Sequence, residues 1–167
     1  MTDLIDTPRA ALRSLFPATP LDPTDAFAQW GVTYLDVESY VAGSRGQLWH
    51  ALPGSFLEYH DDALSFLGPV AFAAILPAYL DALLDDELIL GSIPFAILPA
   101  LSRPKSGSDA ALWRQRFDAR MDHLDADQRR LVVRVLTAFI EKIKPKEARI
   151  LEEQANTALT SFQTLLG

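Results

Sequence analysis

Two short clusters of histidine and acidic residues contain the side chains of this sequence best suited to chemistry. The first cluster contains His50, Glu58, His60, Asp61 and Asp62. Glu58 and Asp62 are four residues apart, so a continuous helix would place both carboxylates on one face. Such oxygens, together with an imidazole nitrogen, can hold a metal ion. The sequence has no H-E-x-x-H or EF-hand spacing, however, so we expect an acidic helix start with a surface histidine and neither metal nor cofactor.

The second cluster places His123 among Asp122, Asp125 and Asp127. A histidine paired with an aspartate can act as a general base, but it needs a nucleophile or a substrate pocket, and the sequence identifies neither. The spacing favours a loop between helices followed by a helix N-cap. The chain also lacks a nucleophile elbow, a phosphate-binding loop and a dinucleotide fingerprint. We therefore predict no catalytic residue and expect that the protein is not an enzyme.

Six arginines in the C-terminal part form a basic set that could bind an anion. They are Arg114, Arg116, Arg120, Arg129, Arg130 and Arg134. We expect them instead to form a solvated face or to pair with acidic residues from the first half of the chain, because surface ion pairs are common and individually weak.

Charge is distributed unevenly along the 167 residues. Residues 1–100 carry 13 acidic and 3 basic side chains, a balance of −10, whereas residues 101–167 carry 9 acidic and 12 basic side chains, a balance of +3. No lysine or arginine lies between Arg45 and Arg103. Carboxylates in that window can attract a basic partner protein and repel nucleic acid. The candidate partner-binding residues are Glu58, Asp61, Asp62, Asp81, Asp85, Asp86 and Glu87.

The elements that position these residues are organised around residues 61–84, the most apolar stretch of the chain. Residues 63–80 carry no charge, a run that reaches the length of a membrane span. Helix-breaking residues interrupt this run and aspartates flank it on both sides, so we predict a buried central helix pair and no membrane segment.

Glycine and proline define the boundaries expected within this stretch. Gly68 should end a short capped turn in a left-handed conformation, and Pro69 suits the first turn of the next helix, where a missing N–H costs nothing. Pro77 removes a hydrogen bond and clashes one turn back. We therefore expect a break or kink near Leu76, followed by a second helix.

Residues 66–80 carry the pattern F-L-x-P-x-A-F-x-x-x-L-P-A-Y-L. Trp49 lies upstream, and the pair Arg116-Phe117 and a D-x-x-Q-R helix start at Asp125 lie downstream. Together these features, over roughly residues 47–143, resemble the DUF6714-like family of small bacterial proteins of unknown function. The resemblance implies a shared fold unit and a bacterial protein, and it implies no catalytic residue.

The rest of the chain also predicts helices separated by turns. Residues 88–90 could form a short strand, but an isolated strand is improbable, and no segment alternates with a period of two. Thr7, Asp36, Ser92 and Asp125 are the expected caps. Further helices are expected at residues 7–15, 37–42 (ended by Gly43), 47–52, 92–101, 109–121, 125–143 and 146–166.

The predicted fold is therefore all-α, a single compact domain over residues 1–167 with two long antiparallel C-terminal helices joined at Lys144-Pro145. Residues 1–30 are expected to form a loosely packed N-terminal arm, and the loop at residues 103–108 an internal seam. The apolar stripe of the last helix could face the core or a second copy of the chain.

The sequence has no cysteine, which excludes disulfides and fits a reducing compartment. It also has no basic leader, so we expect a cytoplasmic protein.

Two functions are compatible with these features. The first is an acidic protein-binding module, an immunity or antitoxin-type inhibitor that covers the basic active site of a partner toxin. The alternative is a small-ligand-binding or regulatory helical protein with a pocket lined by Trp49, Phe72, Tyr79 and Trp113. Such aromatic residues more often belong to the hydrophobic core and line no pocket.

Overall fold

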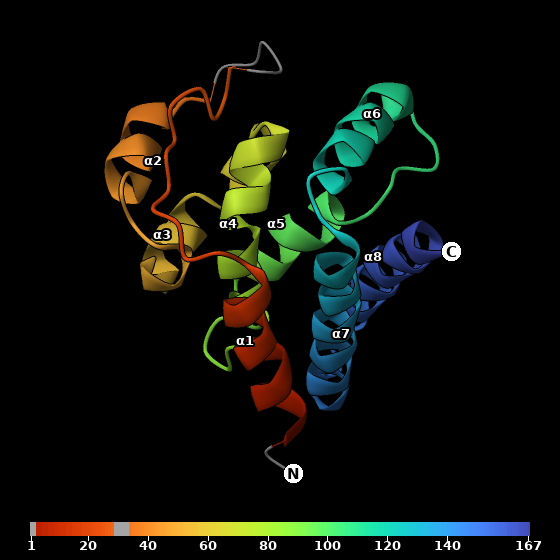
Figure 1. Ribbon diagram of the computed structural model, residues 1–167. Helices are drawn as coiled ribbons and strands as arrows, with labels where there is room; N and C mark the ends of the chain where they lie inside the picture. Colours follow the sequence, from red (N-terminus) through yellow and green to blue (C-terminus); the bar gives the residue numbers. More distant parts are fainter. Residues whose placement is uncertain (1–2, 29–33) are drawn as a thin grey trace.

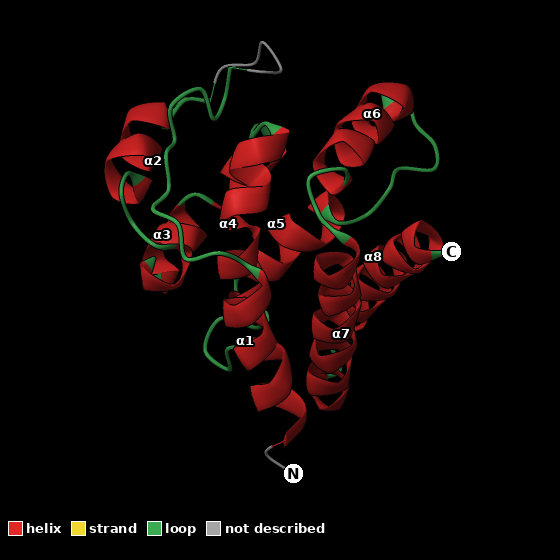
Figure 2. Ribbon diagram, viewed as in Figure 1, coloured by secondary structure: helices red, strands yellow, loops and turns green. Residues whose placement is uncertain are grey.

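The computed structural model describes residues 3–28 and 34–167, with the side chains of the first helix described from residue 8 onward (Figure 1). Within these residues the chain is all-helical and contains no strand, which confirms the predicted fold class (Figure 2). Three short 3-10 helices are η1 (Trp49–Ala51), η2 (Asp61–Ser65) and η3 (Lys144–Lys146). The α-helices are α1 (Asp3–Leu15), α2 (Val37–Ser44), α3 (Gly54–Tyr59), α4 (Pro69–Ala82), α5 (Ser92–Ala100), α6 (Ala110–Met121), α7 (Ala126–Ile143) and α8 (Arg149–Leu166).

Helix α4 lies at the centre of the molecule, surrounded by the other helices (Figure 1). It contacts α1, α3, α5, α6 and η1. Every residue from Ile75 to Leu80 is buried. A helix that is apolar on all sides is typical of a protein core, so the most apolar stretch of the sequence forms the element on which the others pack.

The predicted break near Leu76 is wrong, because α4 continues through Pro77 to Ala82. Proline inside a helix removes one backbone hydrogen bond and costs about 3 kcal/mol. Pro77 is itself buried among the surrounding helices. Burial of apolar surface on every side of α4 offsets that cost, and this contribution depends on neighbours that the local sequence does not specify.

The start of α4 agrees with the sequence in one respect and differs in another. Pro69 is the first residue of α4, as predicted. Gly68 has φ −66°, so it occupies an ordinary extended N-cap conformation and not the expected left-handed one. The short turn before it is the 3-10 helix η2.

The N-terminal helix begins earlier than predicted. It starts at Asp3 and contains Pro8, so the expected N-cap at Thr7 is wrong. Helix α1 packs against α7 and α4. Within the expected arm, residues 1–30, Leu12, Phe16 and Leu21 are buried in the common core, while residues 1, 2, 29 and 30 lie outside the described residues.

The two long C-terminal helices form the largest contact between any two helices described, and α8 returns alongside α7 (Figure 1). Glu147, at φ 55°, follows η3 and completes the turn between them. Helix α8 begins at Arg149, three residues later than predicted, because Lys146 ends η3 and Glu147 and Ala148 form the turn into α8. Its apolar stripe, which includes Leu151, Ala155 and Phe162, is buried in the core.

Several other expected boundaries change. Gly43 lies inside α2 and does not end it, residues 88–90 form a turn, and Asp36 makes no side-chain capping bond. Gly91, and not Ser92, occupies the N-cap position of α5. The loop at residues 103–108 is present as predicted.

No helix in the described part of the chain is long and apolar enough to cross a membrane.

Candidate partner-binding surface

Four elements bring part of the predicted acidic set together: α3, η2, the turn at residues 85–91 and the start of α5. A Cβ atom on Gly54 would lie 3.1 Å from Leu88, and one on Gly91 would lie 3.1 Å from Glu58 Oε1, so α3 packs directly against the turn. Helix η2 follows α3 and contacts α5. We call this region the α3–η2 surface, defined by Glu58, Tyr59, Asp61, Asp62, Glu87 and Leu90.

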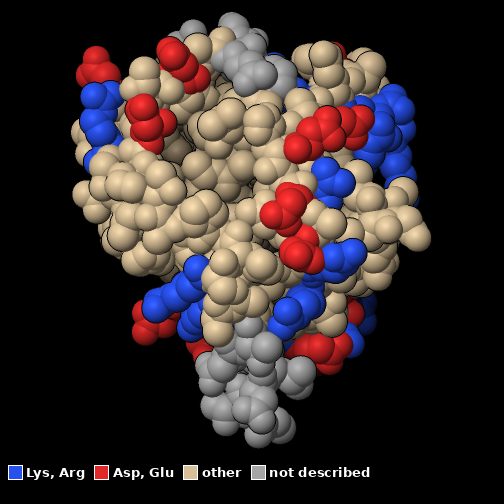
Figure 3. All heavy atoms as spheres, viewed as in Figure 1, with Lys and Arg blue, Asp and Glu red and all other residues tan. Residues whose placement is uncertain are grey.

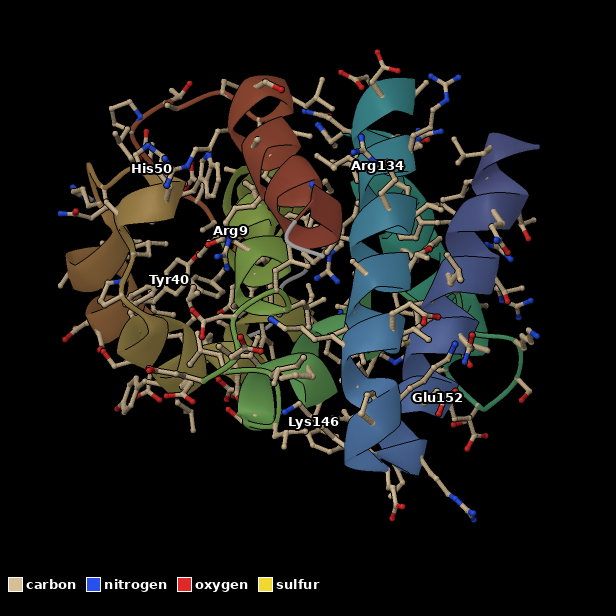
Figure 4. All side chains as sticks on the ribbon, turned by 90° about the horizontal axis from the view of Figure 1, so that it is seen from below. Arg9, Tyr40, His50, Arg134, Lys146 and Glu152 are labelled. Atoms are coloured by element: carbon tan, nitrogen blue, oxygen red, sulfur yellow. The ribbon has the colours of Figure 1, made fainter. Side chains whose placement is uncertain are left out.

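Other acidic residues of the predicted set are engaged with basic residues or backbone. Asp81 Oδ1 accepts a hydrogen bond from Arg9 Nε at 2.6 Å, and Arg9 lies between α1 and α4 in Figure 4. Asp86 Oδ1 lies 3.0 Å from Lys142 Nζ. Asp85 Oδ1 accepts a hydrogen bond from the backbone N–H of Glu87 at 2.8 Å. The structure thus divides the predicted set into residues with a partner in the protein and residues without an ion pair among those described, although Asp86 is exposed as well as paired.

The outward-facing residues combine carboxylates with exposed apolar side chains. No ion pair among the described residues involves Glu58, Asp61 or Glu87. Tyr59 is 63% exposed and Leu90 is 55% exposed. On the face shown in Figure 3, acidic and basic side chains lie close together around an uncharged centre. The uneven charge along the sequence therefore does not make this face uniformly acidic.

A buried polar network lies beneath the α3–η2 surface. His60, expected at the surface, is only 1% exposed. Its Nδ1 lies 2.8 Å from the Tyr34 hydroxyl, which donates to Asp62 Oδ1 at 3.2 Å, and its Nε2 lies 3.4 Å from Ser39 Oγ. A hydroxyl has one proton, so Tyr34 accepts from Nδ1–H when it donates to Asp62. Ser39 then donates to Nε2, and all four groups are satisfied.

The electrostatics of this network favour a neutral histidine. Burial lowers the pKa of His60 from its ordinary value of 6.5, and Asp36 and Asp62 act in the opposite direction. Burial also raises the pKa of Tyr34. The Tyr79 hydroxyl donates to the carbonyl oxygen of His60 at 3.0 Å, which joins α4 to the same residue. The network therefore supports η2 from below and leaves its imidazole closed to solvent.

Sequence reasoning missed this network because Tyr34 and His60 are 26 residues apart. The aspartates near His60 suggested a metal site, but no group of three or more metal-binding side chains lies close together in the part of the chain that the structure describes.

The second histidine cluster forms a helix start, as predicted. Asp125 accepts a hydrogen bond from the backbone N–H of Gln128, and the Gln128 side chain accepts one from the Asp125 N–H, a complete capping box. Asp127 Oδ1 lies 2.6 Å from Arg130 Nη1. His123 is exposed in the preceding loop.

The six arginines do not share one role. Arg130 and Arg134 are exposed, as expected for a solvated face, whereas Arg116 and Arg120 are buried and lie outside any such face. Arg120 donates to the carbonyl oxygens of Ser65 and Leu67. Arg129 donates to the carbonyl oxygen of Met121 at 2.8 Å. These side chains satisfy carbonyl groups where helices end, a role that no sequence pattern indicates.

The four aromatic residues expected to line a pocket lie in different surroundings. Phe72 and Tyr79 are fully buried in the core. Trp49 lines a depression beside the end of α4, whereas Trp113 lines a separate pocket beside α5.

Comparison with protein-family models, curated proteins and solved structures gave no match. The resemblance described for residues 47–143 therefore stays a prediction.

Proposed function

We propose that this protein is an acidic protein-binding module of the immunity or antitoxin type, which covers the basic active site of a partner toxin. The observation that carries this proposal is the exposed Tyr59 ring on a short helix whose neighbouring carboxylates, Glu58 and Asp61, have no ion-pair partner in the residues described. Tyrosine is enriched among the residues that dominate binding energy at interfaces. Carboxylates around it attract a basic protein and repel nucleic acid.

The network beneath the surface supports the same function. His60, Tyr34 and Tyr79 tie η2 to the core, so the backbone carrying Asp61 and Asp62 is held before a partner arrives. A preformed surface loses less conformational entropy on binding, which raises affinity. The cysteine-free composition supports a cytoplasmic site of action.

The test is capture of partners by tagged protein from its native cell lysate at low and high salt, with identification by mass spectrometry. The binding variant combines Glu58→Gln, Asp61→Asn and Glu87→Gln. The control combines Asp109→Asn, Asp122→Asn and Glu153→Gln, which changes the charge equally at exposed positions elsewhere.

We expect one stoichiometric basic protein that salt releases, that the binding variant loses and that the control retains. Tyr59→Ala should also lose it, because the aromatic anchor is removed. Equal retention by both variants would exclude this surface as the interface, and an empty capture would overturn the proposed class.

The alternative, a small-ligand-binding or regulatory helical protein, is supported by a different observation. Arg120 is buried at the side of a pocket that does not include the α3–η2 surface.

A further inference from the structure

A pocket of about 300 Å³ lies between the end of η2, α5, the segment after α5 and α6. In Figure 1, α6 stands beside α5 and a long connection loops out between them. Trp113, Phe117 and Arg120 line one wall, and their spacing places them on one face of α6. The Arg103 guanidinium forms two hydrogen bonds of 2.9 Å to Asp118, which hold the connection against α6 beside the pocket.

Arg120 is the unusual member of this lining because it is a cation that is only 3% exposed. Its Nε and Nη2 donate to backbone carbonyl oxygens, and its guanidinium lies 4.7 Å from the centre of the Phe72 ring. No carboxylate forms an ion pair with it within the described residues. Nη1 makes no hydrogen bond to those residues and is not among the fully buried atoms that lack a partner. This nitrogen therefore remains available to a ligand.

The electrostatic surroundings favour an anion beside Arg120. Burial and the neighbouring Arg116 guanidinium together lower the pKa of Arg120 to about 10, so the cation is desolvated and repelled by a like charge. A buried charge is costly unless it is paired. Carbonyl dipoles compensate it in part, but a carboxylate would supply a full opposite charge and matches the guanidinium geometry.

The remaining walls are mostly apolar: Ala96, Pro99, Trp113 and Phe117 line the space, and Ser65 and Ser102 are its hydroxyl-bearing residues. The Ser102 hydroxyl already donates to the carbonyl oxygen of Leu98. Trp113 is 38% exposed, so its ring can cover a ligand at the mouth of the pocket. One cation among apolar walls matches a ligand with one anionic group and an apolar body better than it matches a phosphate, which requires several donors. The volume lies at the lower end of the range for small-molecule sites, about 300–1,000 Å³.

We propose that this pocket binds a small organic anion, a carboxylate carried on a flat apolar or aromatic body. The carboxylate accepts hydrogen bonds from Arg120 Nη1, and the body packs against Trp113 and Phe117. This site is separate from the proposed partner-binding surface and goes beyond the proposed function.

The test is an NMR titration of the full-length protein with benzoate, followed at the Trp113 indole N–H and the Arg120 Nε–H. Benzamide has nearly the same shape without the charge, and inorganic phosphate has the charge without the apolar body. We expect saturable shifts at both signals with benzoate and at least tenfold weaker binding of benzamide and phosphate.

Two variants locate the site without removing Arg120. Ala96→Glu places a carboxylate inside the pocket and should abolish benzoate binding while the amide spectrum stays that of a folded protein. Trp113→Ala should weaken binding at least tenfold, whereas Leu112→Ala, at an exposed neighbour outside the lining, should leave it unchanged. Absence of saturable shifts, equal binding of benzamide or phosphate, or full binding by folded Ala96→Glu would overturn the proposal.

Discussion

Arg120 Nη2 donates a hydrogen bond of 2.8 Å to the carbonyl oxygen of Leu67, a residue 53 positions earlier in the chain. The same nitrogen reaches the carbonyl oxygen of Ser65 at 3.2 Å. Carbonyl groups at the end of a helix have no partner within the helix, and here α6 supplies the donors for the end of η2. This contact fixes the position of α6 relative to the segment that leads into α4.

We expect Arg120→Met to lower the free energy of unfolding by about 1–3 kcal/mol, because the buried carbonyl group of Leu67 and the part-buried one of Ser65 lose the guanidinium donor. The measurement is urea denaturation. Arg130→Met is the control, since Arg130 is exposed and forms only a local ion pair with Asp127. That change should cost less than about 0.5 kcal/mol. Similar losses in both variants would contradict a structural role for the buried guanidinium.

Tyr34→Phe should lower the free energy of unfolding by about 1–3 kcal/mol, because the hydroxyl that satisfies buried His60 is removed. Tyr59→Phe removes the same group from an exposed tyrosine and should change stability by less than about 0.5 kcal/mol. Urea denaturation of both variants measures the difference. If Tyr34→Phe were as stable as the wild-type protein, the network would not support the fold.

The contribution of His60 should depend on pH. Its pKa is lowered in the folded protein from 6.5, so the unfolded chain binds the proton more readily. The stability contributed by neutral His60 is therefore fully present above pH 6.5 and is lost as the pH falls through the folded-state pKa.

The measurement is the difference in melting temperature between the wild-type protein and His60→Gln from about pH 7.5 to about pH 5. Asp36 and Asp62, which face His60, are present in both proteins, so the difference isolates the histidine. We expect this difference in melting temperature to decrease as the pH falls. A constant gap would show that the protonation of His60 is the same in the folded and unfolded states.

Gly43→Ala should destabilise the protein because a Cβ atom at this position would lie 2.6 Å from the Phe56 ring. We expect a loss of about 1–3 kcal/mol, since overpacking forces neighbouring groups to shift. Phe56→Leu in the same protein should recover part of this loss, and a double-mutant cycle by urea denaturation measures the coupling. Gly46→Ala is the control: its φ of 72° causes strain, but no atom lies within 4 Å, so it should show no coupling to Phe56.

Asp125→Ala should lower the free energy of unfolding by about 1 kcal/mol, because it removes the capping box at the start of α7. Asp109 occupies the same position before α6 but makes no side-chain capping bond. Asp109→Ala should therefore have almost no effect in the same urea titration. Equal effects would show that the capping bond itself adds no stability.

Features that depend on residues close together in the sequence were predictable from the sequence alone. Pro69 begins α4, Asp125 and Gln128 cap α7, and the apolar spacing of α8 identifies its buried stripe. Each of these signals acts over one or two helical turns, through a missing N–H, a side-chain oxygen or a repeat of three and four residues. The all-α fold class follows from the same local patterns.

The tertiary structure alone decided which polar side chains are buried and which helix continues through a proline. Pro77 stays inside a continuous α4, His60 is enclosed beneath η2, and Arg120 crosses from α6 to the carbonyl groups of another segment. The cost of burying such groups, and the contacts that offset it, depend on partners far away in the chain. The sequence therefore determined where helices form and which faces are apolar. Only the packing of those helices decided which charges stay exposed to solvent and which, such as Arg120, are buried.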